Sequence, residues 1–153
     1  MTAHSPFEIF SSNEMETKQL AYKLAEACPK GAVIALYGDL GSGKTVFCKA
    51  FISAKLLIDE SEINSPTFVY LNSYDKENLS LHHFDLYRLK AEGDFADLGF
   101  EEYFYQDGIC LVEWPDKALS FLPENRMEIE LKHLKSGKRS IKVSFKGDFY
   151  ADF

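Results

Sequence analysis

The chain has 153 residues, of which 46% are hydrophobic and 27% are charged, a balance typical of an ordinary globular protein with one hydrophobic core. Its 24 acidic and 17 basic residues give a net charge of −7, which argues against independent binding to nucleic acid, because phosphate contacts need clustered Lys and Arg. No apolar run approaches the length of a membrane span, and the N-terminus lacks the basic and apolar segments of an export signal. We therefore expect a single domain, residues 1–153, in the cytoplasm and away from membranes.

The chain begins with a predicted helix followed by a strand. The helix is expected from Asn13 to Ala27, where apolar residues recur at helical intervals, and Ser11 and Glu14 have the spacing of a capping box. A turn at Pro29-Lys30-Gly31 should end this helix. The apolar run from Ala32 to Tyr37 then predicts a strand.

A phosphate-binding loop is predicted directly after this strand. Its sequence is GDLGSGKT, and it opens a second helix that we expect to run from Lys44 to about Leu57. The glycines let the backbone approach an anion closely, and the N–H groups at the start of the helix can surround phosphates. Lys44 should reach the β- and γ-phosphates of a nucleotide, and the Thr45 hydroxyl should hold Mg²⁺. The residues expected to contact the nucleotide are Gly38, Asp39, Leu40, Gly41, Ser42, Gly43, Lys44 and Thr45.

The middle of the chain predicts a hairpin and a helix. Alternating residues from Phe68 to Tyr74 and from Leu79 to Leu86 read as two strands joined by four polar residues. The segment from Asp94 to Tyr105 is expected to be helical, with a break at Gly99.

The last third predicts a buried strand and a second hairpin. Gly108 to Glu113 is a continuous apolar run, and Met127 to His133 and Ser140 to Phe145 alternate around a Ser-Gly-Lys turn. Residues 1–10 and 147–153 are expected to be frayed tails. The order of elements predicts an α/β sandwich with a mixed sheet.

Two carboxylates end predicted strands. Asp85 follows LSLHHF and Glu113 follows GICLV, so each would lie beside the phosphate loop if its strand adjoins the strand from Ala32 to Tyr37. There they could complete a Mg²⁺ site or orient water. Either residue could instead form a turn or simply face solvent.

Three further residues have more than one interpretation each. Thr67, in Ser65-Pro66-Thr67, lies where nucleotide switches place a hydroxyl that senses the γ-phosphate, but Ser-Pro-Thr is also a common turn. Trp114 could stack near the site, contact a partner or be buried for packing. Arg88 is the best-placed of the three arginines to contact the phosphates or an acidic partner, and a surface ion pair is the alternative.

The cysteines and the adjacent histidines carry little functional signal. The three cysteines are Cys28, Cys48 and Cys110, whose odd number and wide spacing argue against a disulfide framework or a zinc site. His82 and His83 occupy successive strand positions, so they should face opposite sides of the sheet, and a metal site formed by the pair is not expected.

Four segments in this order resemble one protein family. They are GDLGSGKT, Ser65-Pro66-Thr67, HFDLYR from His83 to Arg88, and Glu113-Trp114-Pro115. With them, the chain closely resembles the bacterial TsaE (YjeE) family from about Asn13 to Phe145. The segments HFDLYR and LVEWP are far more specific than the phosphate loop, which many unrelated proteins share.

This resemblance implies a P-loop NTPase-like three-layer α/β sandwich, with a mixed, mainly parallel central sheet and antiparallel hairpins. It implies a Mg²⁺-dependent ATPase subunit needed to form N6-threonylcarbamoyladenosine (t6A) at position 37 of tRNAs that read codons beginning with A. The TsaB-TsaD complex would transfer the threonylcarbamoyl group, so this chain would meet tRNA only through that complex. Hydrolysis is expected to be slow alone and faster with the partners.

The resemblance also assigns roles to residues. Lys44 would bind phosphate, Thr45 and Glu113 would hold Mg²⁺, and Asp85 would support hydrolysis in a segment like Walker B. Lys44, Asp85 and Glu113 are therefore the expected catalytic residues. Thr67 would be the switch residue, and Trp114 would lie near the nucleotide.

Other functional classes fit the chain less well. A small-molecule P-loop kinase would need a mobile cationic lid, and three dispersed arginines supply little material for one. A GTPase is disfavoured because the sequence contains neither DxxG nor [NT]KxD. A nucleotide-dependent binding module without turnover stays open.

Overall fold

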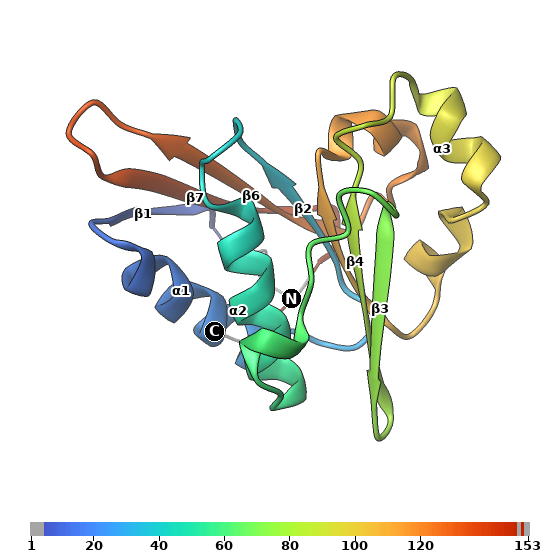
Figure 1. Ribbon diagram of the computed structural model, residues 1–153, viewed down its shortest axis with the longest axis horizontal. Helices are drawn as coiled ribbons and strands as arrows, with labels where there is room; N and C mark the ends of the chain where they lie inside the picture. Colours follow the sequence, from blue (N-terminus) through green and yellow to red (C-terminus); the bar gives the residue numbers. More distant parts are fainter. Residues whose placement is uncertain (1–4, 150, 152–153) are drawn as a thin grey trace.

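The computed structural model describes residues 5–149 and 151, and it is built on a seven-stranded sheet in the order β1-β7-β6-β2-β5-β4-β3 (Figure 1). The strands are β1 (Phe7–Ser11), β2 (Val33–Tyr37), β3 (Leu71–Lys76), β4 (Leu79–Asp85), β5 (Ile109–Glu113), β6 (Arg126–His133) and β7 (Arg139–Lys146). The α-helices are α1 (Glu14–Ala27), α2 (Lys44–Leu56) and α3 (Glu92–Leu98). Three 3₁₀ segments are η1 (Glu60–Glu62), η2 (Glu101–Tyr105) and η3 (Pro115–Phe121).

The four middle strands of the sheet are parallel, and the outer ones are antiparallel. Strand β2 pairs in parallel with β5 on one side and β6 on the other, and β5 pairs in parallel with β4. The pairs β3-β4, β6-β7 and β1-β7 are antiparallel. The predicted mixed sheet with two hairpins is confirmed.

Two hydrophobic clusters cover the two faces of this sheet. Because side chains alternate along a strand, Ile34 and Leu36 of β2 pack under α1 and α2, whereas Val33 and Ala35 pack under α3, η2 and η3 (Figure 1). All five residues of β5 are buried, as expected for a parallel strand covered on both faces. The three-layer α/β architecture is therefore confirmed.

Helix α1 begins at a different cap from the predicted one. The side chain of Asn13 accepts a hydrogen bond from the Glu16 amide at 2.9 Å, and the Glu16 carboxylate accepts one from the Ser12 amide at 2.7 Å. Ser11 instead shares a buried hydrogen bond of 2.8 Å with the Thr17 hydroxyl. The predicted capping box of Ser11 and Glu14 is wrong because the helix begins at Glu14, which makes Asn13 the N-cap residue.

The predicted frayed tails are wrong for the described residues near each end. Residues Phe7 to Ser11 form β1, which pairs antiparallel with β7 and opposes Ile9 to Ile141. Near the other end, Phe149 packs against the core and Ala151 is buried. Backbone pairing and apolar burial hold both segments in place. Residues 1–4, 150 and 152–153, which the tail predictions also covered, lie outside the described residues.

The first hairpin is shorter than the sequence pattern predicts. Strand β3 begins at Leu71 rather than Phe68, because the amides of Val69 and Tyr70 both donate to the Pro66 carbonyl and curl the chain into a turn. The connection to β4 is the two-residue turn Glu77-Asn78.

No helix within residues 5–149 is both long and apolar enough to cross a bilayer.

Candidate nucleotide-binding site

The loop from Gly38 to Gly43 has the backbone shape that its glycines permit. Gly38, Gly41 and Gly43 have φ angles of 153°, 78° and 106°. A Cβ on Gly38 would lie 2.5 Å from the Ser42 hydroxyl and 2.6 Å from the Leu131 carbonyl oxygen, so no larger residue fits there. Gly43 precedes α2 without a side-chain cap, which leaves the first amides of the helix directed at the space above the loop. These features fit a phosphate group.

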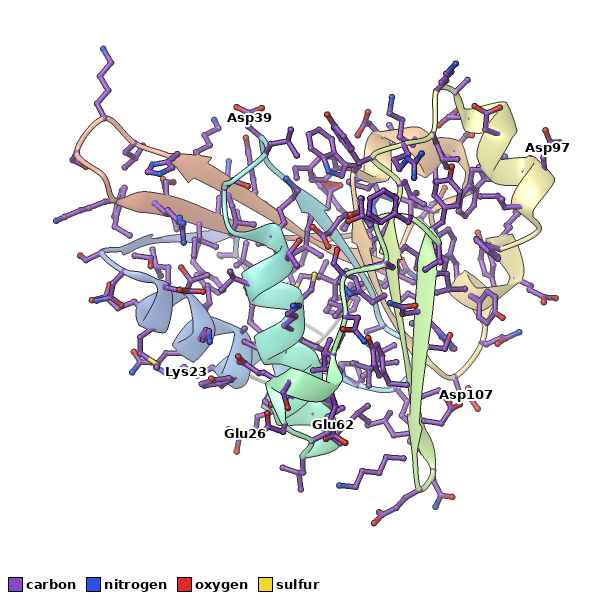
Figure 2. The ribbon with its side chains drawn as sticks, viewed as in Figure 1. Lys23, Glu26, Asp39, Glu62, Asp97 and Asp107 are labelled. Carbon is purple, nitrogen blue, oxygen red and sulfur yellow. The ribbon has the colours of Figure 1, made fainter. Side chains whose placement is uncertain are left out.

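Three of the eight loop residues, Gly38, Asp39 and Ser42, do not line this space. Asp39 is exposed at the tip of the loop, with its side chain pointing away from the body of the molecule (Figure 2). Ser42 is buried, and its hydroxyl has no hydrogen-bond partner among the described residues. Gly38 and Asp39 border a separate cavity on the β6 side. Of the eight loop residues predicted to contact nucleotide, the cavity above the loop is lined by Leu40, Gly41, Gly43, Lys44 and Thr45.

Lys44 lies between the loop and an aromatic ring. Its Nζ donates hydrogen bonds to the carbonyl oxygens of Gly38 and Asp39, the latter at 2.9 Å, and lies 4.3 Å from the centre of the Trp114 ring. Burial lowers the pKa of Lys44, and the nearby carboxylates of Glu113 and Asp85 oppose that effect. The ammonium group is thus a partly desolvated cation, which strengthens its attraction for an anion.

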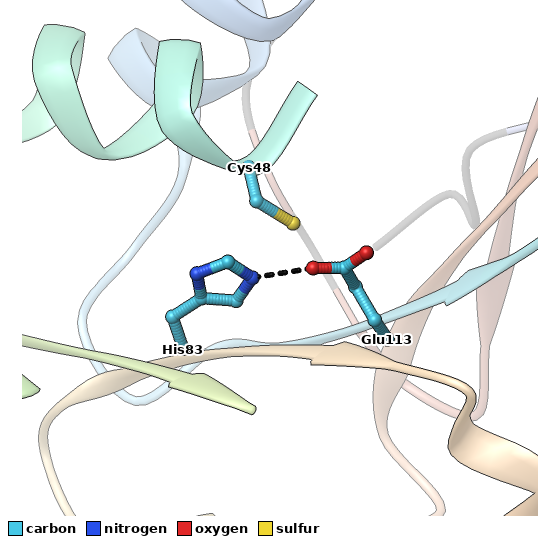
Figure 3. Close-up of side chains that lie close together, drawn as sticks. All are labelled: Cys48, His83 and Glu113. Atoms are coloured by element: carbon cyan, nitrogen blue, oxygen red, sulfur yellow. Dashed lines mark hydrogen bonds and ion pairs between the residues drawn. The ribbon is translucent and has the colours of Figure 1, made fainter. Parts of the chain in front are cut away.

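Glu113 ends β5 at the centre of the site. Its Oε1 accepts a hydrogen bond from the Thr45 hydroxyl at 3.0 Å, and its Oε2 lies 2.6 Å from Nε2 of His83 (Figure 3). Both His83 and Glu113 are almost completely buried. The structure therefore brings together the two predicted Mg²⁺ ligands, Thr45 and Glu113. Their oxygen atoms are the hard ligands that Mg²⁺ prefers.

Asp85 lies beside Glu113, because β4 and β5 pair in parallel and these two residues are direct partners. Strand β4 does not itself adjoin β2, so Asp85 is one strand further from the loop than Glu113. The Asp85 carboxylate accepts hydrogen bonds from the Thr67 hydroxyl at 3.1 Å and from the Tyr87 amide at 3.0 Å. The predicted switch residue is thus connected to the predicted carboxylate.

Trp114 adopts a left-handed backbone conformation, with φ 58° and ψ 52°. This conformation is costly for a residue other than glycine. It directs the chain away from β5 and brings the indole ring over Lys44 and within 5.0 Å of the Tyr87 ring. Of the three interpretations of Trp114, the one that places it at the site agrees with the geometry.

The cavity has a volume of about 430 Å³ and contains one cation that the sequence analysis did not select. Arg139, the first residue of β7, lines it together with Thr67, Asp85 and Glu113. Arg88 lies over the Phe68 ring at 5.0 Å and is not among the lining residues. No local motif marks Arg139, since its position follows from the pairing of the β6-β7 hairpin next to β2.

Cys48 approaches the pair formed by His83 and Glu113 (Figure 3). One ligand atom from each of the three residues lies within 4.8 Å of the others, which is close enough to suggest a metal. Burial raises the pKa of the Cys48 thiol well above its usual range, and the charges of Glu113 and Asp85 raise it further. Because a thiolate is needed to bind a soft metal, these surroundings favour a packed, protonated thiol.

His82 faces the other side of the sheet from His83, as predicted. Its ring there lies 4.6 Å from the ring of Tyr103.

Comparisons with known proteins agree on one family. The family model described as "Threonylcarbamoyl adenosine biosynthesis protein TsaE" matches residues 11–141. A Bacillus subtilis protein named tRNA threonylcarbamoyladenosine biosynthesis protein TsaE is 40% identical over 138 residues, which cover 90% of this chain and 85% of that protein. A Treponema pallidum protein of the same name is 38% identical over 134 residues, covering 88% of this chain and 97% of the relative.

A solved structure supports the same assignment. The crystal structure of YdiB from Bacillus subtilis superposes with a TM-score of 0.78 at 32% sequence identity, and the match covers 97% of this chain and 90% of that one. The match therefore includes the strands and loops that build the cavity. The chain belongs to the TsaE family of threonylcarbamoyl adenosine biosynthesis proteins.

Proposed function

We propose that this protein binds ATP with Mg²⁺ in the cavity above the phosphate loop and hydrolyses it in support of t6A formation at position 37 of tRNAs that read codons beginning with A. The TsaB-TsaD complex would transfer the threonylcarbamoyl group. The contact of 3.0 Å between the Thr45 hydroxyl and the Glu113 carboxylate carries the proposal. It joins the two oxygen ligands that a P-loop protein uses for Mg²⁺, one from the loop helix and one from the neighbouring parallel strand.

The residues around the cavity have separate tasks in this proposal. The amides at the start of α2 and the Lys44 ammonium bind the phosphate chain. Asp85 orients water, or the γ-phosphate through Thr67. Its carboxylate already accepts a hydrogen bond from the Thr67 hydroxyl. Mg²⁺, when bound by Thr45 and Glu113, would neutralise negative charge that develops on the phosphates.

Hydrolysis is expected to be slow in the isolated protein. The cavity holds no arginine on the β4-β5 side among the described residues, where the two carboxylates lie. A cation that stabilises the transition state would then have to come with the partner proteins. The expected result is slow phosphate release by the protein alone and faster release with TsaB and TsaD. Fast release that the partners do not change would contradict this part of the proposal.

Two substitutions test the site directly. Lys44→Ala should abolish ATP binding in calorimetry and leave the overall fold intact, because the contacts that it removes are confined to two loop carbonyls and the Trp114 ring. Glu113→Ala should lose Mg²⁺-dependent phosphate release and largely keep nucleotide binding.

Matched controls are available on α1. Lys23→Ala and Glu26→Ala remove the same charges from exposed positions far from the loop, and they should behave as wild type (Figure 2). Unchanged ATP affinity in Lys44→Ala, or unchanged hydrolysis in Glu113→Ala, would remove that residue from the site. Nucleotide binding by the wild type without turnover, even with the partners, would indicate a binding module instead of an ATPase.

A further inference from the structure

The Thr67 hydroxyl lies in the middle of a chain of three polar side chains. Its Oγ1 is 2.8 Å from the Ser65 hydroxyl on one side, and it donates a hydrogen bond to the Asp85 carboxylate at 3.1 Å on the other. Thr67 and Asp85 line the cavity above the phosphate loop, whereas Ser65 is exposed and is not among the lining residues. Ser65 can therefore act on a group in the cavity only through Thr67.

The direction of these hydrogen bonds follows from the number of protons. A hydroxyl has only one proton to donate, and Thr67 donates its proton to Asp85. The contact between the two hydroxyls must then be donated by Ser65 and accepted by Thr67. The hydrogen bonds therefore run in one direction, from Ser65 through Thr67 to Asp85.

The backbone around these three side chains is held by contacts of its own. The amides of Val69 and Tyr70 both donate to the Pro66 carbonyl, and the Tyr70 carbonyl accepts a hydrogen bond from the Asp85 amide at 3.0 Å. These bonds do not involve the Thr67 hydroxyl. A change of its acceptor therefore requires only that the hydroxyl hydrogen rotates, while the segment stays in place.

The third phosphate of ATP would compete with Asp85 for the Thr67 proton. A phosphate oxygen accepts hydrogen bonds, so Thr67 can donate to it only by releasing Asp85. Asp85 is almost completely buried, and its carboxylate would then lack a donor unless a water takes the place of Thr67. Of the two tasks proposed for Asp85, the proton count therefore favours the orientation of water.

We propose that Ser65 is a positioning residue that directs the single Thr67 proton, toward Asp85 when no third phosphate is present and toward that phosphate when ATP is bound. The inference rests on the proposed ATP binding. Ser65 donates to the Thr67 oxygen in both cases, which fixes that oxygen and leaves its proton free to point only at the other two acceptors. ADP lacks the third phosphate, so Ser65 should contribute to the affinity for ATP and not to that for ADP.

The test measures by calorimetry the affinities of ADP and of the non-hydrolysable β,γ-imido analogue of ATP. Ser65→Ala should weaken binding of the analogue by about threefold, within the range for one neutral hydrogen bond, and leave ADP affinity unchanged. Ser65→Thr should behave as wild type, because it keeps the hydroxyl. Ser12→Ala is the matched control, since it removes an exposed hydroxyl ahead of α1, and it should change neither affinity.

A second substitution tests whether Ser65 acts through Thr67. Thr67→Val keeps the shape of the side chain and removes its hydroxyl, so adding Ser65→Ala should have no further effect on analogue affinity. A further threefold loss in that background would overturn this inference alone. Wild-type affinities in Ser65→Ala, or equal weakening of both nucleotides, would do the same. Failure of the wild-type protein to bind either nucleotide would overturn the proposed function as well, so the two failures are distinguishable.

Discussion

The carboxylate of Glu113 is held between two side chains at the centre of the site. Thr45 donates to one oxygen, and His83 lies 2.6 Å from the other. His83 is completely buried, and its Nδ1 has no hydrogen-bond partner among the described residues. The histidine therefore serves Glu113 alone, which makes it a positioning residue for the predicted Mg²⁺ ligand.

This pairing predicts strong coupling between the two residues. His83→Leu should lower the free energy of unfolding by about 3 kcal/mol, because it leaves a buried carboxylate without its partner. Adding Glu113→Leu should then cost less than it does alone, with a coupling energy of about 1–3 kcal/mol in a double-mutant cycle. Urea unfolding of the four proteins measures this. Additive effects of the two substitutions would mean that the close contact contributes nothing to stability.

The positions of the candidate-site residues were predictable where they follow from local pattern. Lys44 and Thr45 belong to a contiguous motif. Glu113 ends a continuous apolar run that forms β5, and β5 adjoins β2, the strand that leads into the motif. Asp85 was also found at a strand end, although β5 separates its strand from β2. Arg139 was not predictable, because only the pairing of a distant hairpin brings it to the loop. Arg88, chosen for its closeness in sequence to Asp85, lies over Phe68 instead.

Among the elements, α2 ends on a strained residue. Leu57 follows the helix with φ 54° and ψ 47°, a left-handed conformation that glycine adopts at little cost. Its side chain is 81% exposed, so it contributes little burial in return. Leu57→Gly should therefore raise the free energy of unfolding by about 0.5–1 kcal/mol. Leu57→Ala is the matched control, since it removes the same side chain but keeps the Cβ that causes the strain. Equal stability of the two variants would show that backbone strain does not limit this helix end.

The elements themselves were predictable in proportion to the strength of their periodicity. Both long helices and the buried strand β5 carry continuous signals over many residues, and their boundaries agree with the structure. Strand β1 was missed because FEIFS is short and its burial depends on β7, which lies far along the chain. The start of β3 was misplaced because alternation continues through a turn that Pro66 imposes.

For the molecule as a whole, the three thiols report on folding. Cys28, Cys48 and Cys110 are all buried in the described structure. Burial raises the pKa of Cys28 and of Cys110 to about 12. A thiol whose pKa is higher in the folded than in the unfolded state stabilises the folded protein. This stabilisation is complete at a pH below the unfolded-state pKa, and it is lost as the pH rises toward the folded-state pKa. Stability should therefore decline between about pH 9 and pH 12.

Because no thiol is accessible or ionised in the folded protein, a thiol reagent should modify the cysteines only through unfolding. At pH 8 the native protein should react slowly, and all three cysteines should react at once in urea. ATP with Mg²⁺ at about 100 times its dissociation constant should slow the reaction by about 100-fold, since a ligand that binds only the folded state stabilises it by about 2.7 kcal/mol at that concentration. Lys44→Ala should show no such protection, which separates binding at the loop from a general effect of nucleotide or salt. Rapid modification of any cysteine in the native protein would instead reveal local opening of the helix or strand that carries it, and nucleotide would then protect only the cysteines that this opening exposes.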